Sequence, residues 1–168
     1  MEYQKNACFS PQSFENNNKT IGNKKSFITF VSKALQFQSI TFMKKIISTP
    51  NGPAAVGPYS QAIEANGFVF VSGQLPINPA VGKIEAADIT GQTDQVLKNV
   101  SAILAAAGCT LDDVVKNTVF LSDISNFAAM NEVYKQYFKS DYPARSAFAI
   151  RDLPLGALVE IETIAVKS

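Results

Sequence analysis

The stretch QAIEANGFVFVS, residues 61–72, predicts a β-hairpin around which the rest of the fold can be placed. Asn66-Gly67 favours a two-residue hairpin turn, because both residues tolerate the positive φ angles that such a turn requires. After the turn, Phe68 and Phe70 point to one face of the strand, and the two valines that alternate with them point to the other. Both faces of this strand are apolar, so both require a cover.

The patterns on either side of the hairpin predict two helices and several further strands. The first helix is expected over 90–107 and the second over 125–138, since apolar residues recur there at helical spacing. Asp88 or Thr90 can cap the start of the first helix, and Gly108 stands where a left-handed residue ends it. Strands are expected over 44–48, 114–121, 147–150 and 158–166, with loop or irregular chain over 49–60 and 76–83 and a turn at 153–156.

This order of elements, β-β-β-α-β-α-β-β, predicts an α+β fold with both helices on one face of a sheet. The other face of the sheet is also apolar by the alternation described above, and the sequence holds no further helix to cover it. Another subunit is the natural cover for such a face, so the sequence predicts an oligomer.

The composition narrows the range of possible active sites. The 168 residues are 46% hydrophobic and 17% charged, which is typical of a globular protein. The chain has no His, which excludes Ser-His-Asp and Cys-His nucleophiles and the common His-ligated metal sites. Its two Cys are too few for a zinc site or a disulfide framework. A net charge of +1 argues against nucleic-acid or membrane-surface binding as the main activity, and no apolar run approaches the length of about 18 residues that spans a bilayer.

The chain changes composition at Met43, which divides it into an extension over 1–42 and a domain over 43–168. The extension has five Lys and two Glu, a charge of +3, whereas the domain has ten basic and twelve acidic residues, a charge of −2. The extension can be a targeting peptide, upstream sequence translated ahead of a true start at Met43, or a genuine arm. On each interpretation we expect it to be poorly ordered.

Four residues in the domain combine polar groups with apolar surroundings. Arg145 comes two residues after a proline and lies among small and apolar residues, so its guanidinium requires an anionic partner. That partner can be a bound ligand, or internally Glu160 or Glu162, which share one face of the last strand. The two carboxylates can serve as general acid and base or form a solvated strand face. Asn131 lies on the apolar stripe of the second helix, where its amide can bond to a strand or to a ligand.

Other candidates lie in loops and at strand ends. Tyr59 is held on a proline-rich loop, where it can pack or line a site. Ser72-Gly73 ends a strand, and the glycine allows a ligand or another backbone to approach closely. Cys109 has no positive neighbour that would activate it, so we interpret it as a buried, unreactive thiol. The Asp112-Asp113 pair lacks a third carboxylate at metal-loop spacing, so no metal site is predicted there.

Five sequence blocks resemble the RidA/YjgF reactive-intermediate deaminase family. In chain order they are GPYSQA at 57–62, VSGQLP at 71–76, KNTVFL at 116–121, FAAMNEVY at 127–134, and PARS at 143–146 followed by VEIE at 159–162. The resemblance covers 43–168 and leaves out 1–42, and members of the family typically begin near the position of Met43.

The resemblance implies a chorismate-mutase-like α+β fold and a homotrimer whose ligand sites lie between subunits. It also implies hydrolysis of 2-imino acids and their enamine tautomers, such as 2-aminoacrylate, which pyridoxal-phosphate enzymes release; the products are 2-oxo acids and ammonia. Carried across to this sequence, Arg145 would grip the substrate carboxylate and Glu160 would activate the attacking water. The residues implied to line the cleft are Tyr59, Ser72, Gly73, Asn131 and the backbone of Ala147.

Many members of the family have Cys where this chain has Ala147, so the resemblance implies that no thiol is needed here. An imine is already electrophilic, so the reaction requires neither a metal nor a cofactor, only orientation and one activated water. The alternative hypothesis is a non-enzymatic, ligand-binding or regulatory trimer of the same fold. An RNA-cleaving or translation-inhibiting activity is disfavoured by the charge of −2 on the domain. We expect a cytoplasmic protein that binds no nucleic acid and no membrane, or an organellar one if 1–42 is a targeting peptide.

Overall fold

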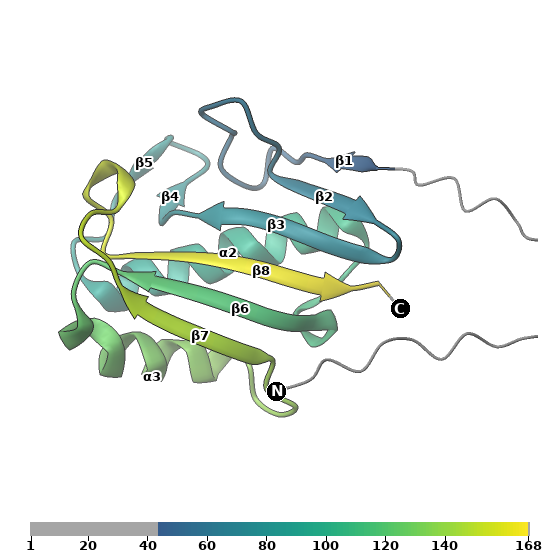
Figure 1. Ribbon diagram of the computed structural model, residues 1–168. Helices are drawn as coiled ribbons and strands as arrows, with labels where there is room; N and C mark the ends of the chain where they lie inside the picture. The colour runs from purple at the N-terminus through teal and green to yellow at the C-terminus, as the bar shows by residue number, and fades with distance from the viewer. Residues whose placement is uncertain (1–43, 168) are drawn as a thin grey trace, which may run out of the picture. The chain divides into compact units, whose positions relative to one another are not determined.

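A six-stranded mixed sheet forms the centre of the protein, as seen in a computed structural model that describes residues 44–167 (Figure 1). The residues 1–43, including the predicted extension, lie outside the described part. Across the sheet the strands are β1 (Lys45–Ile47), β2 (Ala62–Ala65), β3 (Phe68–Gln74), β8 (Val159–Val166), β6 (Val114–Leu121) and β7 (Ala144–Ala149). Neighbouring strands are antiparallel except β6 and β7, which are parallel.

Two helices, α2 (Ile89–Ala107) and α3 (Phe127–Tyr137), lie on the same face of this sheet, which confirms the predicted α+β class (Figure 1). A carboxylate oxygen of Asp88 accepts a hydrogen bond from the backbone N–H of Gly91, so Asp88 caps α2 and the alternative cap, Thr90, lies inside the helix. Gly108 ends the helix at φ 79°, in the left-handed region. The fully buried apolar residues of α2, which form its packed stripe, are Val96, Leu97, Val100, Ile103 and Leu104.

The hairpin predicted over 61–72 is present, with Asn66 at φ 51° and Gly67 at φ 79° in its turn. The valines of β3 are buried against the helices, whereas Phe68 and Phe70 are 43% and 44% exposed on the opposite face. We call this opposite side the outer face of the sheet. Its apolar character confirms the prediction that both faces of the strand are apolar, and within the described chain it has no cover.

Two predicted segments differ from the observed ones. The chain over 76–83 is not irregular but includes most of a small hairpin, with β4 (Ile77–Asn78) paired to β5 (Lys83–Ile84). Its turn is held by the Asn78 carbonyl oxygen, which accepts from two backbone N–H groups, and by Gly82 at φ 69°. The strand expected to begin at residue 147 begins instead at Ala144, because it pairs with β6 from that point onward. Arg145 therefore lies on a strand and not in a loop.

The second helix begins at Phe127 rather than at residue 125. It is preceded by a 3₁₀ turn, η2 (Ile124–Asn126), in which the side chain of Asp123 accepts a hydrogen bond from the backbone N–H of Ser125. Two more short 3₁₀ turns, η1 (Leu111–Asp113) and η3 (Pro154–Gly156), precede β6 and β8. Such single turns follow local hydrogen bonding and leave little periodic signal in a sequence.

Candidate functional site

Arg145 lies on β7, and its side chain packs against the helix α3. The guanidinium carbon is 4.5 Å from the centre of the Tyr134 ring and 5.6 Å from the centre of the Phe127 ring. One terminal nitrogen donates a hydrogen bond of 2.9 Å to the amide oxygen of Asn131. Two aromatic rings and a neutral amide therefore fix the plane of this half-buried guanidinium and leave its charge uncompensated.

The internal ion pair expected as one alternative for Arg145 is absent from the described chain, since none of the ion pairs between residues 44 and 167 includes this side chain. The expectation that Glu160 or Glu162 pairs with it within one chain is therefore wrong. The hydrogen bond between strand and helix that was one alternative for Asn131 is present, and its partner is the arginine.

Strand register explains why Arg145 and Glu160 do not meet. On β6, the partner of Arg145 is Asn117, which points toward the helices and donates to the hydroxyl oxygen of Tyr134. The β6 partner of Glu160 is Phe120, three residues further along, and odd spacing along a strand reverses the direction of the side chain. Arg145 thus faces the helices and Glu160 the outer face, so one chain cannot bring them to the same small substrate.

Glu160 occupies a gap that a glycine leaves open. A Cβ atom built on Gly73 would lie 1.8 Å from Oε1 of Glu160 and 2.9 Å from its Cδ, so the carboxylate fills the space that any other residue would occupy. Burial, with a smaller contribution from the carboxylate of Glu162, raises the pKa of Glu160 above the ordinary value for a glutamate. A carboxylate of raised pKa is a stronger base, which suits the activation of water.

The other predicted site residues lie either near the contact of Gly73 with Glu160 or beside Arg145. Tyr59 is 47% exposed, and its hydroxyl oxygen accepts a hydrogen bond of 3.3 Å from the backbone N–H of Val56. Tyr59 and Gly73 line the same small cavity between the proline-rich loop and the end of β3. The Ser72 hydroxyl donates 2.7 Å to the carbonyl oxygen of Ser60, so it serves the structure of the loop.

Ala147 lies on β7, the edge strand of the sheet, beside Arg145. The backbone N–H of Ile150 donates to the carbonyl oxygen of Leu121 on the neighbouring β6. Backbone groups alternate sides along a strand, so the N–H and carbonyl of Ala147 are directed to the free edge of the sheet. They are therefore available to a ligand that approaches Arg145 along that edge.

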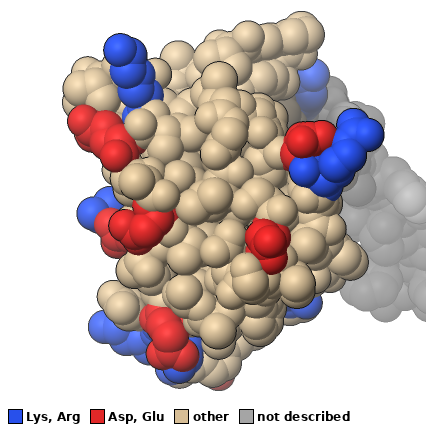
Figure 2. Space-filling view, turned by 90° about the vertical axis from the view of Figure 1, so that its left-hand side faces the viewer, with Lys and Arg blue, Asp and Glu red and all other residues tan. Residues whose placement is uncertain are grey.

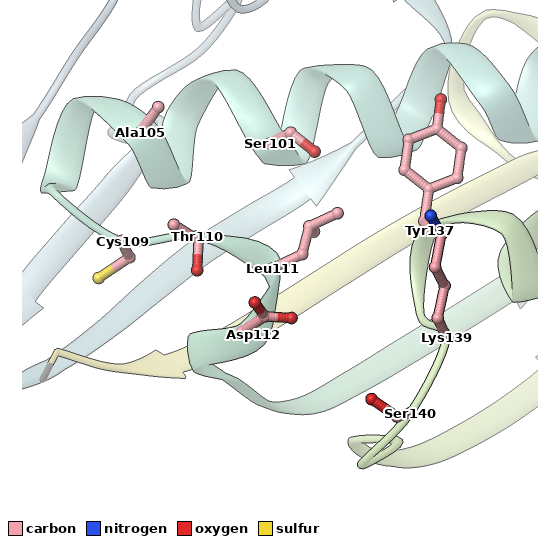
Figure 3. A pocket seen from close by; sticks show the side chains of 9 residues that line it. All are labelled: Ser101, Ala105, Cys109, Thr110, Leu111, Asp112, Tyr137, Lys139 and Ser140. Carbon is pink, nitrogen blue, oxygen red and sulfur yellow. The ribbon is translucent and has the colours of Figure 1, made fainter.

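Two spacious hollows in the described chain contain neither Arg145 nor Glu160. One, of about 540 Å³, lies between the end of α2, η1 and the end of α3 (Figure 3). It includes Cys109, whose thiol is buried and has a pKa raised by that burial, as expected for an unreactive cysteine. The other, of about 570 Å³, lies beside β1 and the loop that carries Tyr59.

Charge is dispersed on one side of the molecule. On the side of the molecule that Figure 2 shows, Lys and Arg side chains stand apart, and several lie next to Asp or Glu. This side offers no continuous basic strip of the kind that follows a phosphate backbone. Among residues 44–167, no three His, Cys, Asp or Glu side chains gather in a way that could hold a metal ion. In the same residues no helix is long and apolar enough to cross a membrane.

Sequence reasoning missed a buried polar group beneath Arg145, formed by Asn117, Thr163 and Tyr134. They are 0%, 1% and 3% exposed. The available signal was the alternation along the two strands. Asn117 lies two residues before the buried Val119 on β6, and Thr163 lies two residues after the buried Ile161 on β8, so both side chains point inward. A polar side chain at such a position requires a hydrogen-bond partner.

Comparison with known proteins agrees with this fold. A family model described as endoribonuclease L-PSP matches residues 49–167. A 2-iminobutanoate/2-iminopropanoate deaminase of the goat, Capra hircus, is 48% identical over 127 residues, which are 76% of this chain and 93% of the relative. The chain belongs to the RidA/YjgF family.

Two further RidA/YjgF relatives show how widely the names given to members of this family differ. A RutC family protein of Pyrococcus horikoshii is 54% identical over 125 residues, 74% of this chain and 99% of the relative. Among solved structures, Escherichia coli TdcF with bound serine is 46% identical, has a TM-score of 0.71, and is matched over 74% of this chain and 99% of that one. The deaminase name supports an enzyme, and the bound serine shows that this relative holds a small amino acid.

Proposed function

We propose that this RidA/YjgF protein is a 2-iminobutanoate/2-iminopropanoate deaminase, which hydrolyses 2-imino acids and their enamine tautomers to 2-oxo acids and ammonia. The observation that carries the proposal is Arg145, whose guanidinium lies on the Tyr134 and Phe127 rings and whose hydrogen-bond partner among residues 44–167 is the neutral amide of Asn131. A fixed, uncompensated guanidinium at a strand edge suits bidentate recognition of a small carboxylate. Each 2-imino acid carries such a carboxylate next to the reacting carbon.

In the proposed reaction, Arg145 holds the substrate carboxylate. The backbone of Ala147, at the free edge of the sheet, forms a hydrogen bond with the imine nitrogen. Glu160 removes a proton from a water molecule, whose oxygen then bonds to C2 of the imine. That proton passes to the imine nitrogen, which gives a carbinolamine. Glu160 then transfers the proton of the new hydroxyl to the same nitrogen, the C–N bond breaks, and ammonia leaves as the C2–O double bond forms. One water is consumed for each 2-oxo acid and ammonia released, so no cofactor takes part.

The opposite directions of Arg145 and Glu160 support a site built between two copies of the chain. The outer face carries Glu160 together with exposed Phe68, Phe70 and Phe148, the last 53% exposed, and a neighbouring copy would cover these rings. We propose a homotrimer in which the β7 edge of one copy brings Arg145 to the Glu160 of the next. Tyr59 and Gly73 would then line the same cleft as Asn131.

A coupled assay tests this function. Threonine dehydratase generates 2-iminobutanoate in situ, and 2-oxobutanoate is followed with and without the protein. The expected result is a rate of 2-oxobutanoate formation that rises with protein concentration and falls in Arg145→Ala. The alternative, a ligand-binding trimer without activity, predicts no acceleration at any concentration together with measurable binding of 2-oxobutanoate.

A further inference from the structure

A chain of buried side-chain hydrogen bonds leads from the middle of the sheet to Arg145. The hydroxyl of Thr163 on β8 donates 2.7 Å to the amide oxygen of Asn117 on β6. The amide nitrogen of Asn117 donates 2.7 Å to the hydroxyl oxygen of Tyr134 on α3. The ring of Tyr134 then lies 4.5 Å from the guanidinium carbon of Arg145. Three elements of the fold are linked in this way to one side chain.

Burying this hydrogen-bonded chain costs desolvation free energy that apolar side chains would not, which suggests a functional reason for it. Its neighbours at inward positions are aliphatic, among them Val119 and Ile161, both 0% exposed. An apolar residue at each of these sites would avoid the desolvation of an amide and two hydroxyls. What the polar chain provides is direction, because a hydrogen bond fixes the orientation of both of its partners where packing alone leaves a choice of rotations.

We propose that Asn117 and Thr163 are positioning residues for Arg145, acting through Tyr134. Thr163 orients the Asn117 amide, the amide holds the Tyr134 hydroxyl, and the fixed ring sets the plane of the guanidinium. Asn131 holds one terminal nitrogen of Arg145 from the other side. The two anchors together aim the remaining N–H groups at the free edge beside Ala147. This inference rests on the proposed function, in which that edge receives the substrate carboxylate.

The test uses the assembled full-length protein, with Thr163→Val and Asn117→Leu as variants and Thr93→Val as the matched control. Thr93 is also fully buried, and its hydroxyl donates 2.7 Å to the Ile89 carbonyl oxygen within α2, in no chain that leads to Arg145. Valine keeps the approximate volume of threonine, and leucine keeps the branched shape of asparagine. Should a single variant fail to fold, the triple variant Thr163→Val, Asn117→Leu, Tyr134→Phe removes the whole polar chain and leaves no unpaired group behind.

The first measurement is independent of enzymatic activity. The sequence contains two arginines, Arg145 and Arg151, so protein labelled with ¹⁵N-arginine gives two Nε–H signals. The heteronuclear NOE of Arg145 should be high in the wild type and in Thr93→Val, and should fall in both variants of the polar chain. Arg151, whose side chain is 95% exposed and whose Nε–H donates to the neighbouring Asp152, serves as the internal surface reference, and its NOE should be the same in all the variants.

The second measurement is functional. In Thr163→Val we expect KM, and the Kd for 2-oxobutanoate, to rise roughly three- to tenfold, the equivalent of one hydrogen bond, while kcat stays within about twofold. Thr93→Val should leave both unchanged. The inference is overturned if the NOE of Arg145 is as high in the variants as in the wild type. It is also overturned if the NOE falls while KM and Kd stay unchanged. If the wild type hydrolyses no imine, the proposed function fails, while the NOE and the 2-oxobutanoate titration still decide the positioning.

Discussion

Replacement of Gly73 by alanine should remove activity without unfolding the protein. The added Cβ would lie 1.8 Å from Oε1 of Glu160, whereas carbon and oxygen atoms in contact are separated by about 3.3 Å. The carboxylate must therefore move by roughly 1.5 Å, the difference between these two distances. A displacement of about 1 Å at a reacting group can cost 10²-fold in rate, so we expect kcat/KM to fall by about that factor or more.

Stability should change little in this variant. Gly73 does not have a positive φ, so alanine is compatible with its backbone. The atom that must move is the end of a flexible, half-buried side chain, which can rotate away from the new methyl group. Alanine lowers the conformational entropy of the unfolded chain, which adds about 0.4–1 kcal/mol to the free energy of unfolding. This gain offsets part of the packing that the displaced Glu160 side chain loses.

The assay compares kcat/KM and the melting temperature of Gly73→Ala with those of a contrasting control, Gly91→Ala. At Gly91 the new Cβ would lie 2.8 Å from the Cβ of Ala86, and its other near neighbour is Asp88 rather than Glu160, so this variant should melt earlier but retain its activity. In a Glu160→Gln background, Gly73→Ala should have little further effect, because the displaced carboxylate is already absent. A folded Gly73→Ala with near-normal kcat/KM would refute the reasoning, as would an equal loss in the two backgrounds.

Four other predictions concern the site, the outer face and the start of the domain. R145A should lower kcat/KM by about 10² or more while the protein stays folded, and R145K should recover only part of it, since a single ammonium lacks the fork of the guanidinium; circular dichroism and the coupled assay check both. The raised pKa of Glu160 places the acid limb of the pH profile of kcat/KM at a higher pH than an ordinary glutamate would, because the base must be ionised; Glu162→Gln removes a like charge and should move that limb to lower pH. Phe70→Lys places a charge in the outer face and should shift the mass found by light scattering toward that of one chain, and an unchanged mass would contradict the proposed interface. A chain that begins at Met43 should fold, assemble and catalyse like the full one, and aggregation of this shorter chain would count against the predicted boundary.

The sequence by itself determined the elements and their chemistry because these depend on local patterns. Asn66-Gly67 specifies its turn, Asp88 and Gly108 specify the ends of α2, and the alternation in β3 predicts two apolar faces. The absence of His limits the chemistry by composition alone, and the isolation of Arg145 among small residues marks it as a group that requires a partner. The compartment and the role of residues 1–42 stay predictions.

Only the tertiary structure decided which side chains meet. Arg145 and Glu160 lie fifteen positions apart in the sequence, and the register of β7 and β8 on β6 sends them to opposite faces of the sheet. That register is set by pairing across three strands, which no local pattern specifies. The contact of Gly73 with Glu160, and the link from Thr163 through Asn117 to Tyr134, likewise join segments that are distant in the chain. Local patterns thus named most of the residues of the candidate site, and the packing of the sheet determined how they are divided between its two faces.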